Sequence, residues 1–182
     1  YSFNVPVEYP KVGEDPSACR VGTIDIATGS IDWLKVPGDP SQHYIVRMEY
    51  LPGTSDLLLQ QLNRKQNHSK IMRVRPGLQP EVIFEEQDKA WVDLVDFGNA
   101  YSVDYTHKFI WMDGGKSFLW VSDRDGWRHL YKVSSDGKQV LPVTPEPFDI
   151  IELSAVDAKS GYAYFLASPD NATQKYLYRK RL

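Results

Sequence analysis

The sequence predicts an all-β fold made of short antiparallel strands joined by tight turns. Aromatic residues, which favour strands, make up 13% of the 182 residues. Short apolar runs alternate with turns that contain Gly or Pro. The clearest example is 109–143, where turns at 113–115, 123–126 and 135–137 separate four such runs. Each turn has a Gly after an Asp, and Gly supplies the positive φ of hairpin turns, so this segment predicts one four-stranded meander.

The chain before this segment predicts further strands. Residues 1–18 contain three prolines and predict an extended connector. Residues 19–36 predict a hairpin that turns at Thr28-Gly29, and 44–87 predict a second four-stranded unit. Within this unit the run D-L-L-L-Q-Q-L-N, which starts at Asp56, also has the propensity for two helical turns. The strands expected on both sides of it favour a strand.

Residues 88–108 interrupt the repeat and predict an insertion between units. They contain four Asp and two Tyr with no clear period, and Ala90–Val95 is their one candidate strand. Loops of this length in a compact domain are often functional. After the unit at 109–143, residues 149–180 predict three strands of a partial unit.

Repeated four-stranded units are typical of a β-propeller, in which each unit is one blade. We therefore expect residues 1–182 to be a fragment of one propeller domain, with about three blades plus the hairpin. The competing fold is an immunoglobulin-type sandwich, but it gives no reason for the repeated order of the strands.

Composition excludes several classes of function. The net charge is −3 and no basic block occurs, which argues against nucleic acid as a partner. No membrane segment is expected, because no run of 18 apolar residues occurs, and the chain shows no signal peptide. Cys19 is the only cysteine, so an internal disulfide and a cysteine metal site are excluded. No two His lie at a metal-ligand spacing, so neither a metal nor another cofactor is expected. The chain opens on Tyr1 rather than Met, so we expect a piece of a longer protein.

The insertion carries the candidate cavity residues. Aromatic and acidic side chains together are able to line a ligand pocket, although a packing role is the favoured interpretation. These candidates are Trp91, Asp93, Asp96 and Phe97. No G-x-S-x-G motif occurs, so no nucleophile of the α/β-hydrolase kind and no catalytic residue is expected in this chain.

The most distinctive polar cluster is D-R-D-G-W-R-H-L-Y, from Asp123 to Tyr131. It is able to bind a ligand at its turn, but a structural role is favoured, with the Asp side chains capping the turn and paired with the Arg. We expect the Trp to pack between blades and the His to be a packed residue rather than a catalytic base. The residues assigned to this structural blade motif are Asp123, Arg124, Asp125, Gly126, Trp127, His129 and Tyr131.

A pair of adjacent acids, Glu85-Glu86, ends one predicted strand. A pair of acids is able to bind a cationic ligand. The favoured interpretation is a solvated strand end, because charges at sheet edges discourage aggregation.

Two stretches resemble a known family. Tyr9–Pro16, followed by the strand Arg20–Ile26, is similar to a Y-P-K-x-G-x-x-N-P segment in the propeller of the dipeptidyl peptidase IV family, with Asp15 in place of the Asn. The segment Ser122–Tyr131 resembles the S-E-R-D-G-x-x-H-[IL]-Y blade motif of the same family, and Trp91-Val92-Asp93 falls at its W-V element. The order and separation of these motifs also match.

The resemblance implies a two-part enzyme: an eight-bladed propeller over an α/β-hydrolase domain with a Ser-Asp-His triad, which releases N-terminal dipeptides with Pro or Ala second. The paired glutamates that bind the substrate amine lie upstream of the Y-P-K segment, so Glu85-Glu86 is not that pair. An Arg that reaches substrate in some members corresponds most nearly to Asp96, a reversal of charge, and its role is not transferred.

This resemblance implies that the chain is a non-catalytic propeller portion that gates and shapes the substrate cavity and is inactive alone. Its implied partners are a peptide substrate and an α/β-hydrolase domain in cis, in a bacterial enzyme that is periplasmic or secreted. The alternative is a protein-interaction or glycan-binding propeller with no peptidase attached. We also expect the chain to self-associate, because an open arc of blades exposes strand edges and faces.

Overall fold

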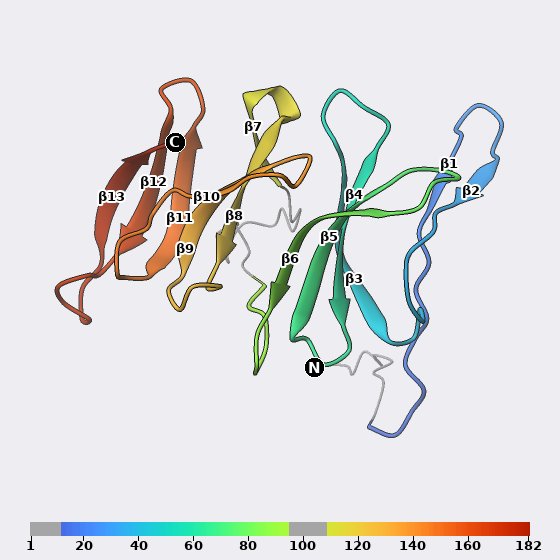
Figure 1. Ribbon diagram of the computed structural model, residues 1–182, viewed down its shortest axis with the longest axis horizontal. Coiled ribbons are helices and arrows are strands. Elements are labelled where there is room, and N and C mark those ends of the chain that lie inside the picture. Colours follow the sequence, from blue (N-terminus) through green and yellow to red (C-terminus); the bar gives the residue numbers. More distant parts are fainter. Residues whose placement is uncertain (1–11, 95–108) are drawn as a thin grey trace, which may run out of the picture.

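The computed structural model describes residues 12–94 and 109–182, which form antiparallel sheets (Figure 1). Tyr9–Lys11 of the first family-like stretch and the candidates Asp96 and Phe97 lie outside the described residues. Within the described ranges the chain forms thirteen strands in four sheets and one short 3-10 helix.

The strands follow one another in chain order, and each sheet is a meander of consecutive strands. The first sheet is a hairpin of β1 (Gly22–Ile24) and β2 (Ile31–Trp33). The second holds β3 (His43–Tyr50), β4 (Leu57–Asn63), β5 (His68–Val74) and β6 (Glu81–Gln87). The third holds β7 (Ile110–Met112), β8 (Ser117–Ser122), β9 (His129–Ser134) and β10 (Val140–Pro142), with the 3-10 helix Asp113–Gly115 after β7. The fourth holds β11 (Ile150–Asp157), β12 (Tyr162–Ala167) and β13 (Tyr176–Arg181).

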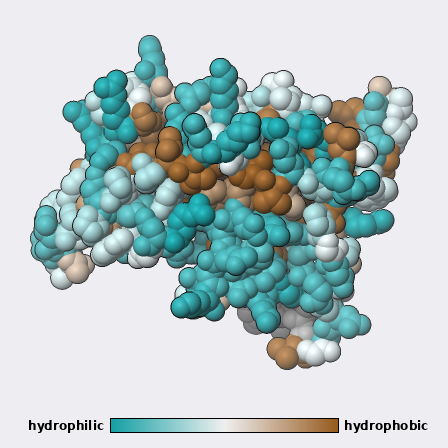
Figure 2. Space-filling model, in the orientation of Figure 1, coloured by the Kyte–Doolittle hydropathy of each residue, from teal (hydrophilic) through white to brown (hydrophobic). Residues whose placement is uncertain are grey.

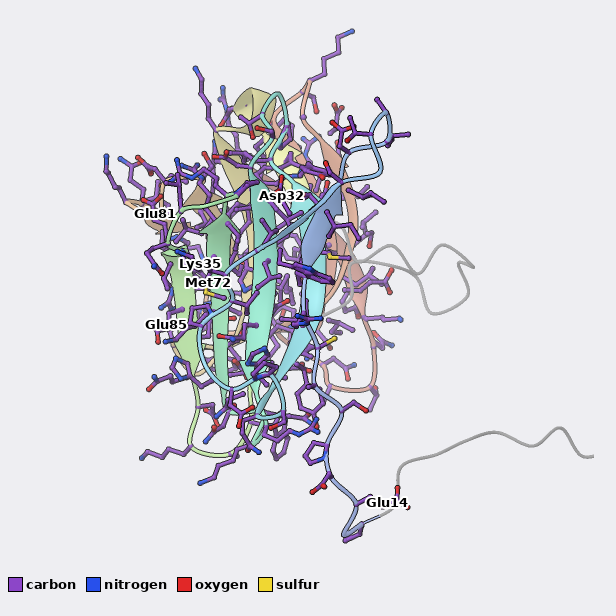
Figure 3. All side chains as sticks on the ribbon, turned by 90° about the vertical axis from the view of Figure 1, so that its right-hand side faces the viewer. Glu14, Asp32, Lys35, Met72, Glu81 and Glu85 are labelled. Carbon is purple, nitrogen blue, oxygen red and sulfur yellow. The ribbon has the colours of Figure 1, made fainter. Side chains whose placement is uncertain are left out.

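The four sheets lie side by side in chain order, as Figure 1 shows from right to left. Figure 3 views the same stack from the hairpin end, with Asp32 on β2 and Glu81 and Glu85 on β6. This arrangement confirms the predicted all-β fold, a partial propeller of four-stranded antiparallel blades. The strand expected from Asp56 to Asn63 is also confirmed as β4, whereas 90–94 form no strand.

Each sheet is apolar on the faces that meet its neighbours. All six residues of β8 are buried, and the four apolar ones, Phe118–Val121, alternate between two core clusters. Phe118 and Trp120 point toward the second sheet, while Leu119 and Val121 point toward the fourth. A period of two with both faces apolar is what a strand between two layers requires.

Two of these packing layers differ in composition. The aromatic interface lies between the second and third sheets and contains Leu58, Ile71, Ile83, Phe84, Phe109, Phe118, Trp120, Tyr131 and Val133. The aliphatic interface lies between the third and fourth sheets and contains Met112, Leu119, Val121, Leu130, Val143, Ile150, Ala163, Phe165 and Ala167. A third cluster, which includes Val21, Leu34 and Met72, joins the hairpin to the second sheet.

Polar side chains add specific links across the aromatic interface. Glu49 on β3 accepts hydrogen bonds from the backbone N–H of Phe109, at 2.9 Å, and from the indole N–H of Trp111, at 3.0 Å. The Arg73 guanidinium donates to the carbonyl of Ser135 at 2.9 Å. These bonds fix the second and third sheets in one relative register, beyond what apolar packing specifies.

Apolar residues also reach the surface. Figure 2 shows apolar groups in a band across the sheets, with hydrophilic surface around it. Exposed apolar side chains occur at both ends of the stack: Ile24, Ile31 and Trp33 on the hairpin, and Ile151, Tyr176 and Leu177 on the fourth sheet. No helix in the described ranges is long and apolar enough to cross a membrane.

Candidate functional site

The chain segment that follows β6 is fixed along the edge of the stack that carries the β4–β5 turn. The backbone N–H of Asp88 donates to the carbonyl of Asn67 at 3.1 Å, and that of Val92 donates to the carbonyl of Gln66 at 2.8 Å. Val92 is buried, whereas its neighbour Trp91 is 66% exposed. The candidate Trp91 is therefore presented to solvent from a backbone that is held in place.

The candidate Asp93 forms an ion pair with Arg128, which lies between the β8–β9 turn and β9. The pair joins the segment 88–94 to the third sheet and defines one edge of the molecule, formed by the turns 64–67 and 123–128 and by 88–94; we call it the rim. It lies at the lower edge of Figure 1. Both side chains are more than a third exposed, so the pair contributes little to stability, about 1 kcal/mol or less.

The turn from Asp123 to Gly126 is built as its sequence predicts. The Gly126 N–H donates to the carbonyl of Asp123 at 2.9 Å, and Gly126 has φ +95°, which disfavours other residues. Ser122 Oγ accepts the N–H of Arg124 at 3.2 Å, and Asp125 Oδ1 accepts the N–H of Trp127 at 3.3 Å. Side chains around the turn thus satisfy its backbone donors.

One expectation for this turn is wrong, the pairing of Arg124 with the Asp side chains. Arg124 forms no ion pair with Asp123 or Asp125 among the described contacts; its guanidinium donates to the carbonyl of Glu85 at 3.3 Å and lies 4.8 Å from the ring of Phe84. It reaches across to the second sheet because a carbonyl and an aromatic face are available there. Trp127 is 42% exposed, so it is not fully enclosed between the sheets.

His129, two residues after Arg128, is almost fully buried. Its Nδ1 lies 2.9 Å from Asp125 Oδ2, and its Nε2 lies 2.7 Å from the carbonyl oxygen of Glu146. The hydroxyl of Tyr131 also bonds to Asp125, and burial together with this bond raises the pKa of Tyr131 to about 12. Burial acts to raise the pKa of Asp125, but the hydrogen bonds from His129 and Tyr131 prevail and lower it.

The expectation that Glu85-Glu86 is a solvated strand end is wrong for one of the two residues: Glu85 is exposed, but Glu86 is buried. Glu85 pairs with His68 and Lys70 at the surface, and the hydrogen bond from His68 lowers its pKa. Glu86 is 7% exposed and accepts the indole N–H of Trp120 at 3.0 Å. Burial raises the pKa of Glu86 despite that bond. A strand end turns one of two adjacent side chains inward, and here the inward one is acidic.

A surface pocket of about 440 Å³ opens at the rim between the third and fourth sheets. Its walls include Asp123, Gly126 and Arg128 of the motif, together with Asp149, Ile150 and Ile151. Asp149 Oδ1 accepts the N–H of Arg128 at 2.7 Å, and the N–H of Ile150 donates to the carbonyl of Arg128 at 2.8 Å. The sequence gives no signal for Asp149, because its contact lies 21 residues away along the chain.

The rim offers carboxylates, guanidinium groups and exposed indoles, which can bind and orient a ligand but include no group placed to cleave it. No group of three or more His, Cys, Asp or Glu is placed to hold a metal in the ranges 12–94 and 109–182. In that part of the chain, His129 is the one His that contacts an acid from a nearly fully buried position, and its ring has no contact with a hydroxyl that it would activate.

Stacked four-stranded meanders with their turns gathered at a common edge define a segment of a β-propeller. The chain belongs to the family described as the dipeptidyl peptidase IV (DPP IV) N-terminal region, whose model matches residues 1–182. It corresponds to part of the propeller region of DPP IV peptidases.

Individual relatives agree with this assignment. Dipeptidyl peptidase 4 of Arthroderma otae is 25% identical over 182 residues, covering 98% of this chain and 22% of that protein. Dipeptidyl peptidase 4 of Trichophyton rubrum is 22% identical over the same length. The crystal structure of Porphyromonas gingivalis dipeptidyl peptidase 4 matches with a TM-score of 0.76 and 26% identity, covering 94% of this chain and 23% of that one. The chain therefore spans less than a quarter of the length of these proteins.

Proposed function

We propose that this chain is a wall of the propeller in a serine exopeptidase that releases N-terminal dipeptides, and that its rim gates and shapes the substrate cavity. The observation that carries the proposal is the family match over residues 1–182. The rim supports it, because Trp91 is exposed on a fixed backbone beside the Asp93–Arg128 pair. Rigid placement of contact groups is what substrate positioning requires.

The proposed partners are a peptide substrate and an α/β-hydrolase domain in the same polypeptide. The described residues supply groups for binding and orientation, so the nucleophile and its base would come from the hydrolase domain. The 182-residue chain alone is then expected to release no dipeptide.

The test is to assay the full protein and the chain alone with a dipeptide p-nitroanilide that has Pro second. We expect hydrolysis by the full protein and none by the chain. In the full protein, Trp91→Ala should raise KM about 3- to 10-fold, the equivalent of a lost apolar contact of about 1 kcal/mol. Trp33→Ala is the matched control, because Trp33 is also exposed but lies on the hairpin away from the rim. A full protein that does not release the dipeptide from this substrate would refute the proposal.

A second candidate is a propeller that binds glycans or proteins with no peptidase attached. It is favoured by the two exposed indoles, Trp91 and Trp127, that flank the Asp93–Arg128 pair in sequence. Exposed aromatic faces stack on sugar rings as well as on peptides. Binding on a glycan array that disappears in Trp91→Ala, together with an inactive full protein, would support this candidate instead.

Two further proposals concern the chain's surroundings. A periplasmic or secreted location is supported by the family resemblance alone, and cell fractionation tests it. Self-association of the chain is supported by the exposed apolar residues at both ends of the stack, such as Trp33 and Leu177. A strictly monomeric species by light scattering at high concentration would contradict it.

A further inference from the structure

The turn between β12 and β13 carries a sequence motif that neither the core nor the rim uses. Residues 171–173 read Asn-Ala-Thr, which is the N-x-[ST] pattern of asparagine-linked glycan acceptors with a residue other than Pro in the middle. The turn lies at the same edge of the stack as the rim (Figure 1), because Ile150 of the rim pocket pairs with Ala167, the last residue of β12.

Asn171 closes this turn with the oxygen of its side-chain amide. Oδ1 accepts the backbone N–H of Thr173 at 3.0 Å and the hydroxyl of Thr173 at 2.8 Å. The backbone carbonyl of Asn171 accepts the N–H of Gln174 at 3.0 Å and the hydroxyl of Ser168. The amide nitrogen, Nδ2, forms no hydrogen bond with a described residue. The turn therefore uses one atom of the amide and leaves the other without a partner.

A second turn shows that the amide nitrogen is not needed for this geometry. Asp39 Oδ1 accepts the backbone N–H of Ser41 at 2.9 Å and the hydroxyl of Ser41 at 2.8 Å, the same pair of bonds. Such turns require a side-chain oxygen only, and an Asp supplies it as well as an Asn does. The nitrogen of Asn171 is therefore available for reaction without cost to the fold.

We propose that Asn171 is the acceptor of an asparagine-linked glycan, attached as the protein passes through a secretory compartment. Nδ2 forms a bond to C1 of the first sugar of a lipid-linked oligosaccharide, and the bond from C1 to the lipid diphosphate breaks. The lipid diphosphate leaves with the bonding electrons, and Nδ2 gives one proton to a base of the transferring enzyme. The inference rests on the proposed secreted location, but not on the proposed peptidase activity.

The surroundings of Asn171 suit a bulky, hydrophilic group, which requires a surface position. Residues 169–177 are all exposed, so a glycan there displaces nothing that packs. The one other match to the pattern in the sequence, Asn67-His68-Ser69, differs in this respect. Ser69 is 2% exposed, and its Oγ accepts the side-chain amide of Gln60 at 2.9 Å. Because two matches occur, the test must read Asn171 itself rather than the total mass.

The test uses the full protein secreted from insect cells. Peptide N-glycosidase in ¹⁸O-water removes the glycan and converts a glycosylated Asn into an Asp that carries ¹⁸O. Mass spectrometry of the peptide that contains Asn171 then reads this residue alone, and a sample without the glycosidase corrects for spontaneous deamidation. We expect the label on most copies of Asn171. Unlabelled Asn171 in the secreted, folded protein overturns the proposal, and the p-nitroanilide assay on the same sample reports the peptidase activity independently.

Three variants test whether the motif selects the acceptor. Thr173→Ala removes the hydroxyl and should abolish the label, whereas Thr173→Ser keeps the hydroxyl and should retain it. Asp39→Asn is the matched control, because it places an Asn in the same pair of hydrogen bonds but directly before Pro40, which the pattern forbids. Position 39 should stay unlabelled. Label that persists in Thr173→Ala, or that appears at position 39, would overturn the assignment to the motif.

Discussion

The two interfaces on either side of the third sheet differ in the residues that pack there. The aromatic interface packs rings against rings: Phe118 lies 5.2 Å from Phe109, 5.7 Å from Trp111 and 6.2 Å from Trp120. The aliphatic interface packs branched chains over alanines, with one stacked ring pair, Phe165 and Tyr178, at 5.9 Å.

Their polar links differ as well. Carboxylates cross the aromatic interface to indole N–H groups, from Glu49 to Trp111 and from Glu86 to Trp120. The aliphatic interface is crossed mainly by bonds to backbone, such as those that join Arg128, Asp149 and Ile150. Ring geometry and side-chain hydrogen bonds fix the aromatic interface tightly. The aliphatic interface depends more on the backbone connection between β10 and β11, which allows adjustment around the rim pocket.

The two interfaces should differ most in how much stability is lost when a core side chain is truncated to Ala. Phe118→Ala should lower the free energy of unfolding by about 4–5 kcal/mol, because a cavity forms among three rings that cannot collapse. Phe165→Ala should cost about 3 kcal/mol, because its smaller neighbours can relax into the space. Urea denaturation of both variants measures this. Equal losses would show that the two interfaces are equally rigid.

The next largest effect should come from Gly137, where the β9–β10 turn lies close to the backbone of β6. Gly137 in the β9–β10 turn has φ +73°, and a Cβ there would lie 2.6 Å from the carbonyl oxygen of Ile83 on β6. Gly137→Ala should therefore cost about 2–4 kcal/mol, from strain plus displacement of β6. Gly29→Ala is the matched control, with φ +72° and no atom within 4 Å of its Cβ, and should cost about 1–2 kcal/mol. Thermal unfolding of both variants separates the cost of the contact with Ile83 from the cost of backbone strain. Equal costs would show that the contact contributes nothing.

The stacking of sheets was predictable from the sequence, but the contacts between them were not. The alternation in F-L-W-V, from Phe118 to Val121, already requires two buried faces, and each Asp-Gly turn marks a strand end. The burial of Glu86 had a usable signal, because it lies two residues after the core residue Phe84 and so shares its face. The bonds of Asp93 to Arg128 and of Arg124 to Glu85 join residues 35 and 39 positions apart, and local pattern does not specify such pairs.

The buried acid makes the aromatic interface sensitive to pH. The folded pKa of Glu86 is raised above the ordinary value of 4.5, mainly by burial, so the folded chain binds the proton more tightly than the unfolded one. Its contribution to stability is complete below pH 4.5 and is lost as the pH rises through the folded pKa. Glu86→Gln keeps an acceptor for Trp120 and should remove this loss, with a gain of about 1 kcal/mol at neutral pH.

Glu85→Gln is the control for that measurement, and its pH effect should have the opposite sign. The pKa of Glu85 is lowered by His68, so its contribution is present above pH 4.5 and is lost as the pH falls. Unfolding free energies measured across acid to neutral pH test both. An unchanged slope in Glu86→Gln would mean that Glu86 is not the titrating group.

The smallest effect should come from the rim. Asp93→Asn removes an ion pair whose side chains are 40% and 36% exposed, so the free energy of unfolding should fall by about 0.5 kcal/mol and the loss should diminish in high salt. Because Asp93 joins the segment 88–94 to the third sheet, the same change should alter substrate binding by the full protein more than stability. A clearly raised KM with only a slightly lowered melting temperature would separate the two roles. A loss of several kcal/mol would instead make the pair part of the packing that joins the sheets, as the polar links of the aromatic interface are.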